Sequence, residues 1–453
     1  MQLSHGLRII NGDNIAFIGG GGKTTAMFQL ATELASTRRV LTTTSTRIFA
    51  AQIKRSPAHV TFEPDRQAVT KILPALKTAI ERYGQVLLVG QTDPESGKAF
   101  GVPSDIIDTL AANGHFDVII NEADGSRMRP FKAPAEHEPV IPASTTVVVP
   151  VVGMDVVGGL LTDEITHRAA IVSRLSQTPL GEPITVETVA AVLSHLQGGL
   201  KNVPTQARVI PLLNKAESPA DLTTARQIAA SLLTTQRIDS VAIGAVQAIQ
   251  SPIKEVHSRT AAVILAAGGS TRFGSPKQLA FWGEQTFIER AVILALAAKV
   301  DRIVVVLGAE IEQCRAVLAG LPVEIVINER WDAGQSTSMQ AGLAALPDNV
   351  GSALFMLVDL PGVRPETLEA LIQRHRQTLA PIVWPEFEER RGNPVLFDRT
   401  LFPELRQISG DIGGRPLLQA YRDRAERVAI ADPAILQDFD RPEDLAKIKM
   451  RNS

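Results

Sequence analysis

The chain has 453 residues, 45% of them hydrophobic, and a formal net charge of −2. A chain of this length is too long for a single hydrophobic core and should form two or three domains. The near-neutral charge argues against nucleic acid as a partner. The single cysteine, Cys314, excludes an intrachain disulfide and fits a reducing compartment. No apolar run has membrane-spanning length without charge or proline, and no signal-peptide pattern opens the chain, so we expect a cytoplasmic protein that does not bind membranes.

The first motif is an apolar strand that leads into a glycine loop. Residues 15–18 are apolar, four glycines follow, and Lys23-Thr24-Thr25 opens a predicted helix. Such a loop resembles a P-loop, in which amides hold phosphates, the lysine reaches the β- and γ-phosphates and a threonine binds Mg²⁺. Phe17 stands where the full pattern has its first glycine. We predict ATP or GTP binding at Gly20, Gly21, Gly22, Lys23, Thr24 and Thr25.

Two later segments extend this predicted nucleotide site. Residues 116–120 form an apolar strand that leads to Glu122 and Asp124, as a Walker-B metal site requires, so these two carboxylates and Thr24 are predicted metal ligands. Residues 212–217 look like the Asn-Lys-x-Asp segment that reads guanine, with Glu in the place of Asp. Asn214 and Lys215 are therefore predicted nucleotide-binding residues, and the choice between ATP and GTP stays open.

The longer stretch 122–139 is similar to YqeC, a family described as an accessory to selenium-dependent molybdenum hydroxylases. Its polar positions are matched by Lys132, His137, His167 and Arg168, and the resemblance covers about residues 5–250. It implies a role in maturing a molybdenum hydroxylase, with that enzyme or its chaperone as partner. For the two histidines, a metal site and ordinary solvent-facing loops both stay open.

A polar, proline-containing stretch at residues 251–260 precedes a clean strand predicted at Ala261–Ala266. We therefore predict two different domains, residues 1–255 and 256–453. Downstream, strands and helices alternate regularly, which is typical of a mostly parallel sheet buried on both faces. The predicted strands are 303–307, 323–327 and 353–358, and the predicted helices are 311–318 and 337–346.

The strand at 261–266 runs into the most specific motif of the chain. Small residues at 267–269 let backbone amides approach a ligand, and Arg272 and Lys277 add charge where a triphosphate would bind. Asp359 follows the apolar strand at 353–358, and ligands of parallel sheets bind at such strand ends. A carboxylate there can hold Mg²⁺; the alternative is a cap for the helix that begins near Arg364.

The loop resembles the signature of nucleotidyltransferases, which release pyrophosphate from an NTP. Together with Val358-Asp359-Leu360-Pro361 and Arg391-Gly392-Asn393-Pro394-Val395 it most resembles MocA, the molybdenum cofactor cytidylyltransferase, over about residues 260–447. The resemblance implies transfer of CMP from CTP to the phosphate of Mo-molybdopterin. Phe273 and Asn393 stand where the family usually has Met and often has His.

Site residues follow from this resemblance. The implied catalytic residues are Arg272, Lys277 and Asp359, and a closing Asp-x-Asp-x-Pro-Glu-Asp motif adds Asp440 to Asp359 as a Mg²⁺ ligand, unless Asp440 caps a helix. The implied CTP-binding residues are Leu265, Ala266, Ala267, Gly268, Gly269, Ser270, Arg272, Lys277 and Ser338. The implied acceptor-binding residues are Gly392, Asn393, Pro394, Asp411, Gly414 and Arg415.

The sequence thus predicts two three-layer α/β domains, an N-terminal P-loop NTPase-like one and a C-terminal Rossmann-like nucleotidyltransferase. Two alternatives stay open. Pro276-Lys277-Gln278 also occurs in cytidylyltransferases acting on sugar or isoprenoid-precursor phosphates, so the acceptor can differ. The other alternative is a non-catalytic P-loop chaperone that carries the cofactor to an apo-hydroxylase.

Overall fold

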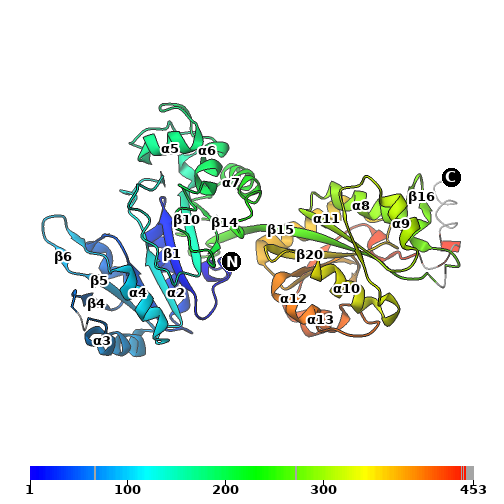
Figure 1. Ribbon diagram of the computed structural model, residues 1–453, viewed down its shortest axis with the longest axis horizontal. Helices are drawn as coiled ribbons and strands as arrows, with labels where there is room; N and C mark the ends of the chain where they lie inside the picture. Colours follow the sequence, from blue (N-terminus) through cyan, green and yellow to red (C-terminus); the bar gives the residue numbers. More distant parts are fainter. Residues whose placement is uncertain (66–67, 271–272, 440, 442, 445–453) are drawn as a thin grey trace. The chain divides into compact units, whose positions relative to one another are not determined.

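The computed structural model describes residues 1–65, 68–270, 273–439, 441 and 443–444. The chain divides into two compact units, Met1–His257 and Ser258–Ser453 (Figure 1). Each unit is an α/β domain with its own sheet and with helices packed on both sides, which confirms the predicted fold class. Within the described residues, no helix is both long enough and apolar enough to cross a membrane.

The central sheet of the N-terminal unit is built from parallel strands. All of these strands except β4 are buried along nearly their whole length, as expected when helices cover both faces. In spatial order they are β4 (His59–Phe62), β5 (Gln85–Gly90), β2 (Val40–Thr44), β8 (Val118–Glu122), β1 (Asn14–Gly19), β10 (Val147–Gly153), β13 (Leu212–Asn214) and β14 (Ser240–Gly244). Because β1 and β8 are neighbours, the glycine loop after β1 meets Glu122, the last residue of β8, and Asp124, just after it, at one sheet edge.

Helices complete this unit. β1 continues through the glycine loop into α2 (Lys23–Leu34), which packs on the central strands. One apolar core gathers β2, β5 and β8 with α3 (Ala68–Tyr83) and α4 (Ser104–Ala112). Another gathers β10, β13 and β14 with α5 (Ala169–Ser176), α6 (Val186–Ser194) and α7 (Pro219–Leu232).

The sheet of the C-terminal unit is mostly parallel, with β23 running opposite to its neighbours. Alternate residues of its central strand enter two different cores, Ala262 and Ile264 one and Val263 and Leu265 the other, so both faces are covered. The order is β19 (Glu324–Ile327), β18 (Arg302–Leu307), β15 (Ile253–Ala266), β20 (Val350–Leu357), β23 (Val395–Asp398), β21 (Ile382–Phe387) and β24 (Glu426–Ala429). The main helices are α8 (Phe287–Ala297), α9 (Ile311–Leu318), α10 (Gln335–Ala344) and α11 (Pro365–Thr378).

The strand predicted at Ala261 begins earlier, at Ile253, so the prediction of its start was wrong. The polar residues that suggested a linker are accommodated within the strand. Glu255 accepts hydrogen bonds from the guanidinium of Arg226, at 2.9 and 2.5 Å, and lies 2.8 Å from a ring nitrogen of His257. Buried polar groups that bond to one another can stay in a strand, which a hydropathy pattern alone does not reveal.

Candidate active site and P-loop site

A cleft of about 700 Å³ lies in the C-terminal unit where β15 and β20 end. It is lined by the end of β15 and the glycine loop, by the end of β20 and by the segment that leads into α10. The cleft brings together all eight of the predicted CTP-binding residues that the structure describes. Its lining is Leu265, Ala266, Ala267, Gly268, Gly269, Ser270, Lys277, Gln278, Trp331, Asp332, Ala333, Gly334, Gln335, Ser338, Leu357, Val358, Asp359, Asp411 and Arg415.

Lys277 and Asp359 form the charged centre of this cleft. The Lys277 ammonium lies 3.0 Å from a carboxylate oxygen of Asp359, and their side chains are 11% and 22% exposed. Asp359 follows β20, and Lys277 begins a short helical turn after the loop. The alternative of a helix cap at Asp359 is wrong, because Arg364 is the N-cap of α11.

Gln278 holds the glycine loop in shape and was missed in the sequence. Its amide nitrogen donates to the carbonyl oxygens of Ala266 and Gly268, at 3.0 and 2.5 Å. Ser270 accepts a hydrogen bond from the backbone N–H of Lys277 and donates one to Gln278, at 3.0 and 3.2 Å. These bonds tie the loop to the turn that carries Lys277. The sequence Pro276-Lys277-Gln278 was the feature from which a role for Gln278 could have been predicted.

The predicted acceptor residues divide into two groups. Asp411 and Arg415 line the cleft, and Asp411 accepts a hydrogen bond from the backbone N–H of Gln335 at 3.1 Å. The residues that line the cleft in the described part of the chain do not include Gly392, Asn393, Pro394 or Gly414. Two predicted residues, Arg272 and Asp440, lie outside the described residues.

The donor set fits a magnesium ion that arrives with a nucleotide. No cluster of three metal-binding side chains occurs among the described residues. Magnesium, however, is commonly held by one or two carboxylates plus substrate phosphates, without an all-protein cage. Asp359 is such a carboxylate, at the end of a strand and facing the cleft.

In the N-terminal unit, the structure places Lys23 among carboxylates. Its side chain is 2% exposed, its ammonium donates to the carbonyl oxygen of Gly19 at 2.6 Å, and it lies 3.1 Å from Asp124 and 3.8 Å from Glu122. Thr24 donates its hydroxyl hydrogen to Glu122 at 2.7 Å. Burial raises the pKa of Glu122, against the charge of Lys23. The predicted phosphate-binding and metal-binding residues are thus assembled, bonded to one another.

Three amides of the glycine loop, those of Gly19, Gly20 and Gly21, are also bonded within the protein. Gly19 N–H donates to Asp124 at 3.0 Å, Gly20 N–H to the carbonyl of Val151 at 2.8 Å, and Gly21 N–H to that of Arg129 at 3.0 Å. A Cβ on Gly20 would lie 2.6 Å from the Arg129 oxygen. Close backbone packing therefore explains part of the glycine run, and phosphate binding at these amides requires the loop to open.

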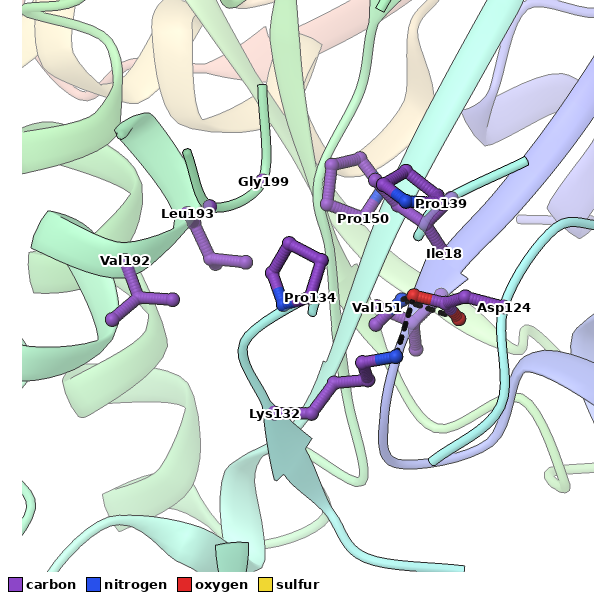
Figure 2. Close-up of a pocket in the computed structure, with 12 residues that line it drawn as sticks. Ile18, Asp124, Lys132, Pro134, Pro139, Pro150, Val151, Val192, Leu193 and Gly199 are labelled. Carbon is purple, nitrogen blue, oxygen red and sulfur yellow. Dashed lines mark hydrogen bonds and ion pairs between the residues drawn. The ribbon is translucent and has the colours of Figure 1, made fainter. Parts of the chain in front are cut away.

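Behind this loop, Lys132 bridges two carboxylates, those of Glu138 and of Asp124, and Figure 2 draws its contact with Asp124. Its fully buried ammonium lies 3.1 Å from Asp124 and 2.7 Å from Glu138, which also accepts a hydrogen bond from Arg168 at 2.5 Å. Burial opposes ionisation of Glu138, but Arg168 and Lys132 outweigh it and lower its pKa to about 2. An adjoining cavity of about 20 Å³ has room for about one water.

The histidines of this region have different settings. The side chain of His137 is 77% exposed. Burial and the nearby charges of Arg168 and Lys132 lower the pKa of His167 to about 4. The two do not belong to a cluster of three metal-binding side chains in the described part of the unit.

Asn214 supports the glycine loop through both ends of its amide. Its nitrogen donates to the carbonyl of Gly21 at 2.7 Å, and its oxygen accepts from the N–H of Val246 at 2.9 Å. Lys215 forms an exposed ion pair with Asp155 at 2.6 Å. Asn214 therefore acts on the shape of the loop in this structure.

Comparisons with known proteins match the two units separately. The model of the YqeC protein family matches residues 15–170, and that of the MobA-like NTP transferase domain matches residues 262–426. The uncharacterized protein YqeC of Escherichia coli K12 is 32% identical over 202 residues, which are 44% of this chain and 75% of that protein. Nicotine blue oxidoreductase of Paenarthrobacter nicotinovorans is 30% identical over 193 residues, 41% of this chain and 94% of that protein.

A solved structure, that of Rv0371c from Mycobacterium tuberculosis H37Rv, is 29% identical and covers 42% of this chain and 97% of its own, with a TM-score of 0.39. The two family matches fall on the two different units. The chain therefore belongs to the YqeC family through its N-terminal unit and to the MobA-like NTP transferase family, as a nucleotidyltransferase, through its C-terminal unit.

Proposed function

We propose that the C-terminal unit is a cytoplasmic molybdenum cofactor cytidylyltransferase, which transfers CMP from CTP to the phosphate of Mo-molybdopterin and releases pyrophosphate. The observation that carries this proposal is the Lys277–Asp359 pair in a cleft bordered by a glycine loop. The membership in the MobA-like NTP transferase family gives the reaction class. The cytidylyl donor and the pterin acceptor rest on the motifs that resemble MocA.

The chemistry asks for charge and positioning, since one phosphate attacks another. Lys277 would stand beside the leaving pyrophosphate, and the amides of the loop at residues 267–269 would orient the triphosphate. Asp359 would hold Mg²⁺, which supplies neutralisation of phosphate charge. Arg415 in the same cleft would bind the acceptor phosphate. No covalent intermediate is needed.

The N-terminal unit would bind ATP or GTP through Lys23 and Thr24, for a step that matures or delivers the cofactor to a molybdenum hydroxylase or its chaperone. This part of the proposal is supported by the joint placement of Lys23, Thr24, Glu122 and Asp124 at the carboxyl ends of two neighbouring strands.

The test is incubation of the full chain with each NTP, Mg²⁺ and Mo-molybdopterin, followed by pyrophosphate measurement and mass spectrometry of the pterin. We expect the mass of the pterin to increase by one cytidylyl group with CTP and to stay unchanged with the other NTPs. If pyrophosphate were released only with a sugar phosphate or an isoprenoid-precursor phosphate, that compound and not the pterin would be the acceptor. If the pterin stayed unchanged and reached an apo-hydroxylase intact, the chain would be a cofactor carrier.

The relative named an oxidoreductase makes a redox function the second candidate, because this chain covers 94% of it. The protein, supplied with a reduced nicotinamide dinucleotide and an oxidised dye as hydride acceptor, would show absorbance loss at the nicotinamide band as the dye is reduced, if that function held. A lysine and a carboxylate beside a glycine loop favour phosphate chemistry.

A further inference from the structure

We infer that the indole of Trp331 is the surface on which the base of the nucleotide stacks in the C-terminal cleft. The inference deepens the proposed function, on which it rests for the presence of an NTP. Trp331 lies in the turn after β19, lines the cleft and is 36% exposed. A tryptophan that keeps a third of its surface in a cleft has apolar area left to bury against a ligand.

Two glycines set the position of this indole. A Cβ on Gly308, just after β18, would lie 2.6 Å from Cβ and Cγ of Trp331. A Cβ on Gly269 would lie 3.0 Å from the far edge of the six-membered ring. The ring therefore spans from the end of β18 to the glycine loop after β15. A side chain at Gly308 would push the ring away, and one at Gly269 would crowd its far edge.

The turn that carries Trp331 is fixed by a buried asparagine. The amide of Asn328 donates to the hydroxyls of Thr337 and Ser338, at 2.8 and 3.0 Å, and accepts from the N–H of Arg330 at 3.1 Å. These bonds connect the end of β19 to the first turn of α10, across the turn at 331–333. Trp331 is thus held before any ligand arrives, so little rotamer freedom is lost on binding.

The charged groups of the cleft suit the phosphates, the metal and the acceptor, which leaves Trp331 as the surface for the base. Lys277 and Asp359 are the groups suited to phosphates and metal, and Arg415 with Asp411 is on the segment predicted to face the acceptor. Ser338, which accepts a bond from Asn328, still carries its own hydroxyl proton and lines the cleft with Trp331.

Tryptophan fluorescence tests the inference directly. The chain has three tryptophans, Trp282, Trp331 and Trp384, and all lie in the C-terminal unit, so the signal does not report on the P-loop site. We expect CTP to quench the full chain and inorganic tripolyphosphate, which has no base, to leave its emission unchanged. The quench should persist in the matched control Trp282→Phe, whose indole packs edge-on against Phe439 at 5.3 Å, and be lost in Trp331→Phe.

Affinity gives the second readout, by calorimetry in a Lys23→Ala background that removes the P-loop lysine. Trp331→Ala should weaken CTP binding by about 5- to 150-fold, the range of one base–aromatic stack. Trp331→Phe should recover most of that loss. Tripolyphosphate should bind all variants equally, which also shows that they are folded.

Equal CTP affinity of Trp331→Ala and its parent would overturn the inference, and so would an equal loss for CTP and tripolyphosphate. If CTP stacks on Trp331 but no CMP reaches the pterin, the proposed acceptor is wrong and the stacking surface stands.

Discussion

Replacement of Lys132 by methionine tests the buried charge network of the N-terminal unit. Lys132→Met keeps much of the side-chain length but leaves Asp124 and Glu138 without the ammonium that lies 3.1 and 2.7 Å from them. The lowering of the Glu138 pKa from 4.5 to about 2 corresponds to about 3 kcal/mol at about 1.4 kcal/mol per pH unit. Arg168 shares that contribution, and Asp124 adds a second loss.

We therefore expect the free energy of unfolding of the N-terminal unit to fall by about 3 kcal/mol at pH 7, the lower end for a broken buried pair. Urea denaturation followed by far-UV circular dichroism reports both units, whereas tryptophan fluorescence reports the C-terminal unit alone, because all three tryptophans lie there. The fluorescence transition should not move. Lys215→Met is the matched control, since its ion pair with Asp155 is 43% and 49% exposed and contributes about 0–1 kcal/mol.

The pH dependence has a defined sign. The pKa of Glu138 is lower in the folded protein, so its contribution to stability is full above pH 4.5 and is lost as the pH falls through about 2. In Lys132→Met the folded-state pKa rises, and the stability of the unit should depend less on pH across that window. A Lys132→Met variant no less stable than Lys215→Met, with an unchanged pH profile, would refute the role given to Lys132.

Three further predictions concern the two sites. Asp359→Asn should lower pyrophosphate release by about 100-fold or more, because it removes a metal-binding charge, while the fluorescence unfolding transition stays in place; near wild-type turnover at saturating Mg²⁺ would contradict this. Lys277→Ala should lower kcat for transfer, because the transition state loses about 2–4 kcal/mol of stabilisation. Steady-state kinetics that showed only a raised KM for the acceptor would place the lysine elsewhere. Lys23→Ala should remove ATP or GTP binding by the N-terminal unit in calorimetry but leave CMP transfer by the full chain intact, and loss of transfer would mean that the two sites are coupled.

Much of the architecture follows from apolar periodicity. The helix predicted at 311–318 is α9, and the strand predicted at 303–307 is β18 extended by one residue, because alternation of buried strands and helices leaves little freedom in an α/β sheet. Lys277 and Asp359 are 82 positions apart, yet meet because the ends of neighbouring parallel strands share an edge.

Other features depend on contacts that no local pattern encodes. The Gln278 amide reaches two carbonyls, and the indole of Trp331 covers two glycines from different loops. Likewise, the carbonyl that takes the Gly21 amide belongs to Arg129, more than a hundred residues away in the chain. Glycines that receive a neighbouring backbone and glycines that receive a phosphate look alike in a sequence.

The self-bonded glycine loop after β1 has a thermodynamic consequence. A nucleotide can use the amides of Gly19, Gly20 and Gly21 only in molecules whose loop has opened. If about one molecule in 100 were open, the apparent affinity would be about 100-fold weaker than that of the open form. A protein that drew the segment at residues 124–130 away from the loop would free the amides of Gly19 and Gly21 and so raise that affinity, and by linkage the nucleotide would tighten the protein's own binding equally. The N-terminal unit would then hold nucleotide chiefly while its partner is bound.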